Sequence, residues 1–163
     1  MCQVHDFGEW LEHTSWVTTI ANTAWLYTSI SVVHYFTLLV MVGSIVLLDL
    51  RVLGVAARRR PLTQLAEELF PWMWTAFGLA IFSGFLEFTT DAGDYLPDKV
   101  FRVKMTVIFL AVMSAIVVQR GVPKWGQLPA IPTSAKVIAF VSILLWIGSI
   151  LAGVEIAALS GLG

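Results

Sequence analysis

The chain contains few charged residues and a single cysteine, and each scarcity excludes a class of protein. Charged side chains make up 13% of its 163 residues, against about 25% in a typical soluble domain. Ten basic and eleven acidic residues give a formal net charge of −1. This charge balance does not indicate the basic surface that a nucleic-acid-binding protein has. Because Cys2 is the sole cysteine, an internal disulfide and an all-cysteine metal site are excluded. HExxH, phosphate-loop and dinucleotide motifs are absent too.

Apolar residues, by contrast, are abundant and arranged in long runs. They make up 58% of the chain, and a membrane-crossing helix needs about 17–25 of them in one segment. Four segments meet this requirement: 26–50, 71–88, 100–118 and 135–159. Pro71 is expected in the first turn of the second span, where its missing N–H costs nothing, and the third span should end before Gly121 and Pro123. We therefore predict an all-α membrane protein, a single domain built as a four-transmembrane-helix bundle.

Residues 1–25 show a different pattern, which is typical of a helix lying on a membrane surface. Apolar positions recur at helical spacing along this segment, with acidic residues largely on another side. Trp10, Trp16 and Trp25 suit the headgroup region of a bilayer. We predict an N-terminal amphipathic surface helix in contact with membrane lipid.

Basic residues are concentrated around two of the three connections between the predicted spans. These residues are Arg51, Arg58, Arg59 and Arg60 in the first connection, and Arg120, Lys124 and Lys136 in the third. The N-terminal stretch has no lysine or arginine before the first span. Because short cytoplasmic loops are enriched in these residues, both termini should lie outside. We expect the membrane to be the inner membrane of a bacterium.

Each predicted span contributes one ionisable residue at a similar depth in the outer half of the bundle. These residues are His34, Glu87, Lys104 and Glu155. Ionisable side chains inside a membrane cost several kcal/mol unless they are paired or hydrated, so each is a candidate functional residue. Together they predict either a polar site or a salt-bridged lock between the helices. Asp49, at the inner end of the first span, is expected to cap that helix at the headgroups.

His34 is the strongest candidate for a metal ligand, because neutral imidazole binds haem iron and a helical bundle can hold a flat macrocycle. A satisfied core histidine and a proton relay are the alternative interpretations of this residue. No other predicted span contains a histidine, so a second axial ligand would come from elsewhere, or the iron would be five-coordinate. The candidates for that ligand are His5, His13, Met41, Met73, Met105, Lys104 or a residue of a second subunit.

Four further residues are candidates for binding the same cofactor. Ser83 and Gly84 belong to a strip of small residues on the face of Glu87, which permits either close helix packing or a planar ligand. Lys104 and Arg102 lie about 200° apart on the third span, so we expect Lys104 to face inward and Arg102 to face outward. Lys104 would then pair with an acidic residue of the cluster or neutralise a haem propionate.

Several short runs in the chain resemble an uncharacterised bacterial family of small four-span membrane proteins. They include Glu9-Trp10-Leu11, Trp25-Leu26-Tyr27, His34 through Gly43 to Gly54, Ser83-Gly84 and Phe101-Arg102-Val103-Lys104. More remotely, the chain is similar to CopD-type copper-resistance membrane domains and HemJ-type haem-binding membrane proteins. Those proteins share a histidine in an early span, a Ser/Thr-Gly pair in the next and a lysine entering the one after. The resemblance implies haem b held near His34 and Lys104.

Two functions remain open on this basis. The first is a small b-type haem protein for electron transfer near the periplasmic side of the membrane, with Lys104 or Arg102 facing the propionates. Such a protein is expected to be a subunit of a larger complex or a homo-oligomer. The alternative is a cofactor-free accessory or assembly subunit, in which the polar residues only lock the bundle. A porphyrinogen-oxidising enzyme is a third hypothesis, which rests on the resemblance alone.

Overall fold

The computed structural model describes the backbone of residues 2–160 and the side chains of residues 7–153. Every regular element in this part of the chain is a helix. The helices are α1 (Cys2–Glu12), α2 (Ser15–Asn22), α3 (Ala24–Leu53), α4 (Leu62–Thr90), α5 (Ala92–Tyr95), α6 (Lys99–Trp125) and α7 (Thr133–Ser160). Four of them, α3, α4, α6 and α7, are long and apolar enough to cross a membrane. The predicted four-span helical bundle is confirmed, and the chain is a multi-pass membrane protein.

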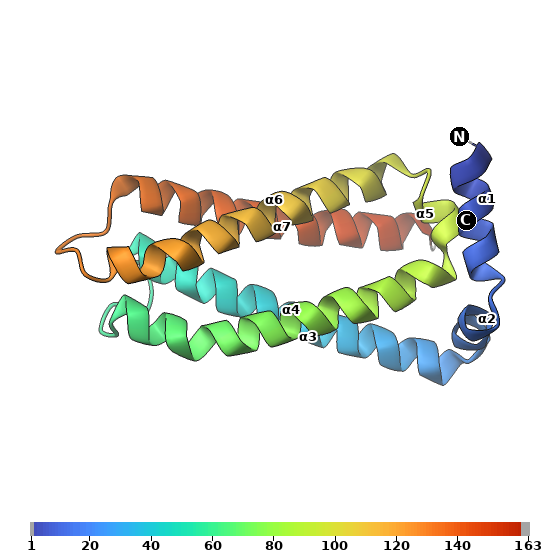
Figure 1. Cartoon of the computed structure of the whole chain (residues 1–163), viewed down its shortest axis with the longest axis horizontal. Helices are drawn as coiled ribbons and strands as arrows, with labels where there is room; N and C mark the ends of the chain where they lie inside the picture. The colour runs from blue at the N-terminus through green and yellow to red at the C-terminus, as the bar shows by residue number, and fades with distance from the viewer. Residues whose placement is uncertain (1, 161–163) are drawn as a thin grey trace.

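The bundle consists of two antiparallel helical hairpins (Figure 1). In one hairpin α3 packs along α4, in the other α6 packs along α7, and the two hairpins meet chiefly through α3 and α7. One end of the bundle is covered by α1, α2 and α5, and we refer to it as the capped end. The opposite end carries the loops 54–61 and 126–132 together with Arg58, Arg59 and Arg60, and we refer to it as the basic end.

Two layers of buried side chains hold the hairpins together. The layer near the basic end consists of Leu48, Val52, Leu62, Ala66, Val118, Val122, Ala135 and Ala139. The middle layer consists of Met41, Ile45, Met73, Ala76, Ala111, Ala115 and Trp146. Because lipid tails are as apolar as these side chains, the hydrophobic effect does not drive the helices together inside the membrane. Their association depends on close van der Waals packing, and the small alanine side chains let the helices approach closely.

All four long helices extend beyond the spans predicted from the apolar runs, and α4 and α6 do so by the most. Helix α4 begins at Leu62, so Pro71 lies inside it rather than in its first turn. Leu62 and Ala66 are buried in the layer at the basic end, and this burial extends the helix through its polar residues. Helix α6 likewise continues through Gly121 and Pro123 to Trp125. The ring of Trp125 occupies the space where a side chain at position 121 would lie, so glycine allows this last turn to close.

The single N-terminal surface helix of the sequence prediction is two helices in the structure. The first helix ends at Glu12. Thr14, whose backbone is extended, is the N-cap residue of the second helix, α2. The Glu12 carboxylate accepts a hydrogen bond of 2.6 Å from the backbone N–H of Gly93 at the start of α5. Helix α1 is therefore tied to the protein at the capped end. Phe7 and Trp10 stack on each other at its exposed surface.

Helix α3 is not capped by Asp49, contrary to the sequence prediction. It ends at Leu53 and is followed by the C-cap residue Gly54, which has a φ of 77°, a left-handed conformation that glycine adopts without strain. The N–H of Gly54 donates to the Arg51 carbonyl, and the N–H of Val55 donates to the Leu50 carbonyl. Asp49 lies about one turn earlier and is 1% exposed, because it shares the core-facing side of α3 with Ile45, Leu48 and Val52.

The contact between α1 and α5 gives a first testable prediction. A Cβ atom at Gly8 would lie 2.7 Å from both the Cα and the N of Gly93, and a backbone cannot yield as a flexible side chain can. Replacing Gly8 with valine should release α1 from the capped end, and hydrogen exchange of the α1 amides should then accelerate by about tenfold or more, as expected for an overpacking penalty of about 1–3 kcal/mol. Gly43→Val is the control, because nothing lies within 4 Å of a Cβ there. Unchanged exchange in the Gly8 variant would contradict the tight contact.

Candidate functional site

The orientation of the His34 ring is fixed by helix α4. Nδ1 of His34 lies 3.1 Å from the carbonyl oxygen of Ala80 and 3.1 Å from Oγ of Ser83. The Ser83 hydroxyl hydrogen points to the Leu79 carbonyl at 2.7 Å, which leaves its oxygen free to accept. Because a carbonyl oxygen can only accept, Nδ1 carries the proton and donates it toward Ala80. In the neutral ring the lone pair therefore belongs to Nε2.

Nε2 of His34 faces a carboxylate on the same neighbouring helix. It lies 3.9 Å from Oε2 of Glu87, which is too far for a hydrogen bond, and the two groups attract each other only when the ring is protonated. The two side chains are only 17% and 21% exposed. Glu87 follows Ser83 by four residues, so both lie on the face of α4 that meets α3. The arrangement leaves Nε2 available to a proton or a metal ion.

Gly84 determines how closely the imidazole approaches α4. A Cβ atom at this position would lie 2.8 Å from Cε1 and 3.3 Å from Nδ1 of His34. Any side chain larger than hydrogen would therefore push the ring away from Ala80 and Ser83. The Ser83-Gly84 pair thus forms a cradle in which the serine accepts a hydrogen bond and the glycine makes room for the ring.

Lys104 brings a positive charge to this cluster from the second hairpin. Its side chain is half-buried, and its charge interacts with both Glu87 and His34. On the side of α7, a Cβ at Gly153 would lie 3.4 Å from Nζ of Lys104. The structure therefore gathers an imidazole, a carboxylate and an ammonium group from three different helices near the capped end.

The other residues considered from the sequence do not join this cluster, or they lie outside the described side chains. Arg102 is exposed, and its Nη2 donates to the Pro97 carbonyl at 3.3 Å. The side chains of Glu155 and His5 lie outside residues 7–153. His13 is exposed. The methionines Met41 and Met73 are buried in the middle layer, while Met105 is 50% exposed.

A stack of three aromatic rings lies beside the site and was not anticipated from the sequence. The centroids of Phe88, Tyr95 and Phe101 lie 5.4–6.4 Å apart, and the interplanar angles are 13–22°. Burial, followed by the negative charge of Asp91, raises the pKa of the Tyr95 phenol to about 12, so this group stays neutral at physiological pH. The three rings come from α4, α5 and α6, and no sequence spacing reveals such a combination.

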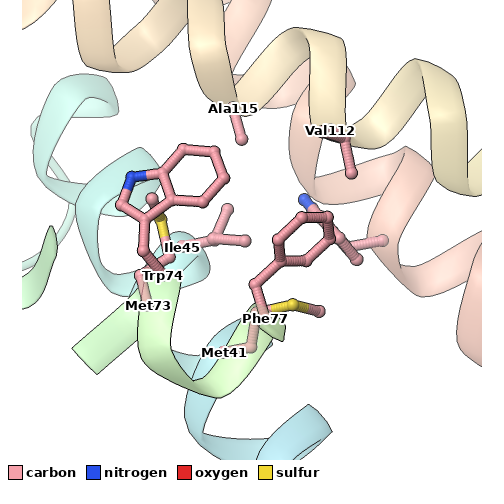
Figure 2. A pocket seen from close by; sticks show the side chains of 8 residues that line it. Met41, Ile45, Met73, Trp74, Phe77, Val112 and Ala115 are labelled. Atoms are coloured by element: carbon pink, nitrogen blue, oxygen red, sulfur yellow. The ribbon is translucent and has the colours of Figure 1, made fainter. Parts of the chain in front are cut away.

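Two small hollows lie close together among the described residues, which provide no protein-only metal site. No group of three or more His, Cys, Asp or Glu side chains converges among them. The first hollow lies between the hairpins and is lined by apolar side chains including Met41, Ile45 and Phe77 (Figure 2). The second adjoins it and is lined partly by Asp49. His34 lines neither of these hollows.

Comparison with known families identifies the chain. A model of a family of unknown function, DUF6644, matches residues 7–158, and the chain belongs to this family. The match includes all four spans and every residue of the His34 cluster. No curated protein and no solved structure matches the chain.

Proposed function

We propose that this member of the DUF6644 family is a b-type haem protein whose axial ligand is Nε2 of His34. The observation that carries the proposal is the hydrogen bond from Nδ1 of His34 toward the Ala80 carbonyl at 3.1 Å. Metal-binding histidines almost always donate their other ring N–H to a backbone carbonyl or a carboxylate, which fixes the tautomer and aims the free nitrogen. His34 has this arrangement inside a largely apolar helix.

The residues around His34 suit haem in their chemistry. Gly84 leaves room for the imidazole to pack against α4. The Lys104 ammonium group could pair with a haem propionate, and this electrostatic attraction is stronger in a low-dielectric site. Haem bound here would supply a one-electron iron couple. The chain itself would supply the ligand, a fixed ring orientation and a compensating charge.

We further propose a remote relationship to HemJ-type and CopD-type proteins, which would imply haem at the same residues. The positions that carry it are His34, Ser83, Gly84 and Lys104, and these are the residues that lie together near the capped end. We propose that the site lies near the periplasmic side of a bacterial inner membrane, since Arg58, Arg59 and Arg60 lie in the loop between α3 and α4 at the opposite end. Electron transfer with a partner subunit or a second copy of the chain would follow from this location.

A cofactor-free accessory subunit is the second candidate, and one observation favours it. Glu87 lies 3.9 Å from Nε2 of His34 and interacts with Lys104 across the hairpins. The charges of the cluster can therefore compensate one another without a ligand. In that case, Lys104→Ala should lower the melting temperature in detergent, and the purified protein should be colourless.

A visible absorption spectrum of the full chain, purified in detergent from haem-replete cells, tests the proposal. We expect a Soret band that shifts on dithionite reduction, with α and β bands, and we expect His34→Gly to lose it. Because imidazole can enter the space left by the side chain, adding free imidazole to His34→Gly should restore the band. Gln64→Ala changes an exposed residue at the basic end. It is the control for losses of haem during purification and should keep the band. A colourless wild-type preparation would overturn the haem proposal.

A further inference from the structure

A second group of polar side chains lies deep in the bundle, away from the His34 cluster. Asp49 on α3 is 1% exposed, and Ser142 and Trp146 on α7 are 0% and 2% exposed. Both carboxylate oxygens of Asp49, Oγ of Ser142 and Nε1 of Trp146 have no hydrogen-bond partner among the residues that the structure describes. An unsatisfied buried polar group costs about 1–3 kcal/mol, so four such atoms together require an explanation.

Asp49 and Ser142 meet across the contact between α3 and α7. The Ser142 hydroxyl lies beside the Asp49 carboxyl group but outside hydrogen-bond geometry, and Trp146 lies four residues further along the same face of α7. Asp49 borders one of the two small hollows, and Trp146 borders the other. The hollows adjoin, since both are lined by Ile45, Met73 and Ala115. Figure 2 shows Ile45, Met73 and Ala115 around the hollow that Trp146 borders.

No countercharge is present for an ionised carboxylate here. The other residues that line the hollow beside Asp49 are Ile45, Leu48, Phe70, Met73, Ala115 and Val118. They come from α3, α4 and α6, and all are apolar. From α7, the one group that interacts with Asp49 among the described side chains is the uncharged Ser142 hydroxyl. A charge buried without a cation or a donor is strongly unfavourable in so apolar a setting.

The set of donors and acceptors discriminates between the possible ligands. A metal cation such as Ca²⁺ or Mg²⁺ needs about six or more oxygen ligands, whereas this group offers three side-chain oxygens and an indole N–H that can only donate. A protonated carboxylic acid and a water molecule fit better. Buried water typically makes about three hydrogen bonds to polar groups that otherwise lack a partner. Here it would accept from Trp146 and bond to Asp49 and Ser142.

We propose that Asp49 is a proton-binding site inside the membrane, held as the neutral acid and linked by a bound water to Ser142 and Trp146. On release, the O–H bond of the acid breaks, the electron pair stays on the carboxylate, and the proton passes to water and leaves at the basic end. Asp49 lies about 8 Å along the helix from Gly54 at that end, at 1.5 Å per residue. The proposal does not depend on haem at His34.

Infrared difference spectroscopy of the full chain in lipid nanodiscs tests the protonation of Asp49. We expect a carbonyl stretching band of a protonated carboxyl group at neutral pH, which shifts when H₂O is replaced by D₂O. The band should be absent in Asp49→Asn, whose side chain has nearly the same shape. It should persist in Asp94→Asn, which removes an exposed carboxyl group.

Two more variants connect the band to the proposed water. Ser142→Ala and Trp146→Phe each remove one hydrogen-bonding group, and each should shift the frequency of the Asp49 band without abolishing it. These variants also keep the test independent of whether Asp49→Asn folds. If no Asp49-dependent band exists at neutral pH, or if added sodium ions remove it, Asp49 is ionised and the proposal is wrong. A band unchanged after equilibration in D₂O would equally overturn it.

Discussion

Replacing Gly84 with valine should displace the His34 imidazole and lower the proposed haem binding by about tenfold to a hundredfold. The Cβ atom alone would lie 2.8 Å from Cε1 of His34, so the ring must leave the Ala80 carbonyl. Overpacking of this kind costs about 1–3 kcal/mol, and each 1.4 kcal/mol corresponds to about a tenfold change in affinity. The measurement is the haem content per polypeptide after purification.

The matched control for this experiment is Gly78→Val on the same helix. Gly78 is exposed, and nothing lies within 4 Å of a Cβ there, so haem content should stay unchanged. Displacement of the ring can also be detected without haem, because the hydrogen-bonded Nδ1–H resonance of His34 should disappear from nitrogen-edited NMR spectra of Gly84→Val. Retention of that resonance in Gly84→Val would contradict the geometry described for the site.

The architecture of the bundle was predictable because one physical constraint decides it. Backbone groups in a bilayer must be satisfied internally, so a long apolar run becomes a helix whatever its detailed packing. The ends of the helices were less predictable. Helix α4 begins at Leu62 rather than at Pro71, since burial against the other hairpin extends it beyond its apolar run, and hydropathy does not record such tertiary contacts.

The site near the capped end was partly predictable for a related reason. Helical periodicity places Ser83, Gly84 and Glu87 on one face, and the structure brings His34 and Lys104 to that face. Periodicity says nothing about which nitrogen of the ring is protonated. That answer comes from the Ala80 carbonyl, a backbone group that no residue pattern identifies.

Asp49 shows how a sequence pattern can predict the wrong environment. An acidic residue beside Arg51 near the end of an apolar run is typical of a headgroup anchor. The structure instead turns Asp49 toward the core, because it follows Ile45 by four residues and precedes Val52 by three. Ser142, which interacts with it, belongs to a helix more than ninety positions later in the chain, so local reasoning could not bring the two together.

The largest change in stability is expected from Trp146→Ala. Trp146 is 2% exposed and contributes to the middle layer between the hairpins, and truncating a buried tryptophan costs about 3–5 kcal/mol through lost contacts and the cavity left behind. Unfolding by titration with a denaturing detergent measures this loss. Trp74→Ala should cost less, because Trp74 is 36% exposed and its Nε1 donates to Gln119 at 3.1 Å near the surface.

Trp146→Phe separates the packing of this side chain from its hydrogen bond. The phenyl ring keeps much of the apolar contact, so most of the stability lost in the alanine variant should return. If Nε1 donates to a bound water shared with Asp49, a residual loss of about 0.5–1.5 kcal/mol should remain. If the indole N–H has no partner at all, removing it should instead leave stability unchanged or raise it, because the buried donor is then a cost to the folded state.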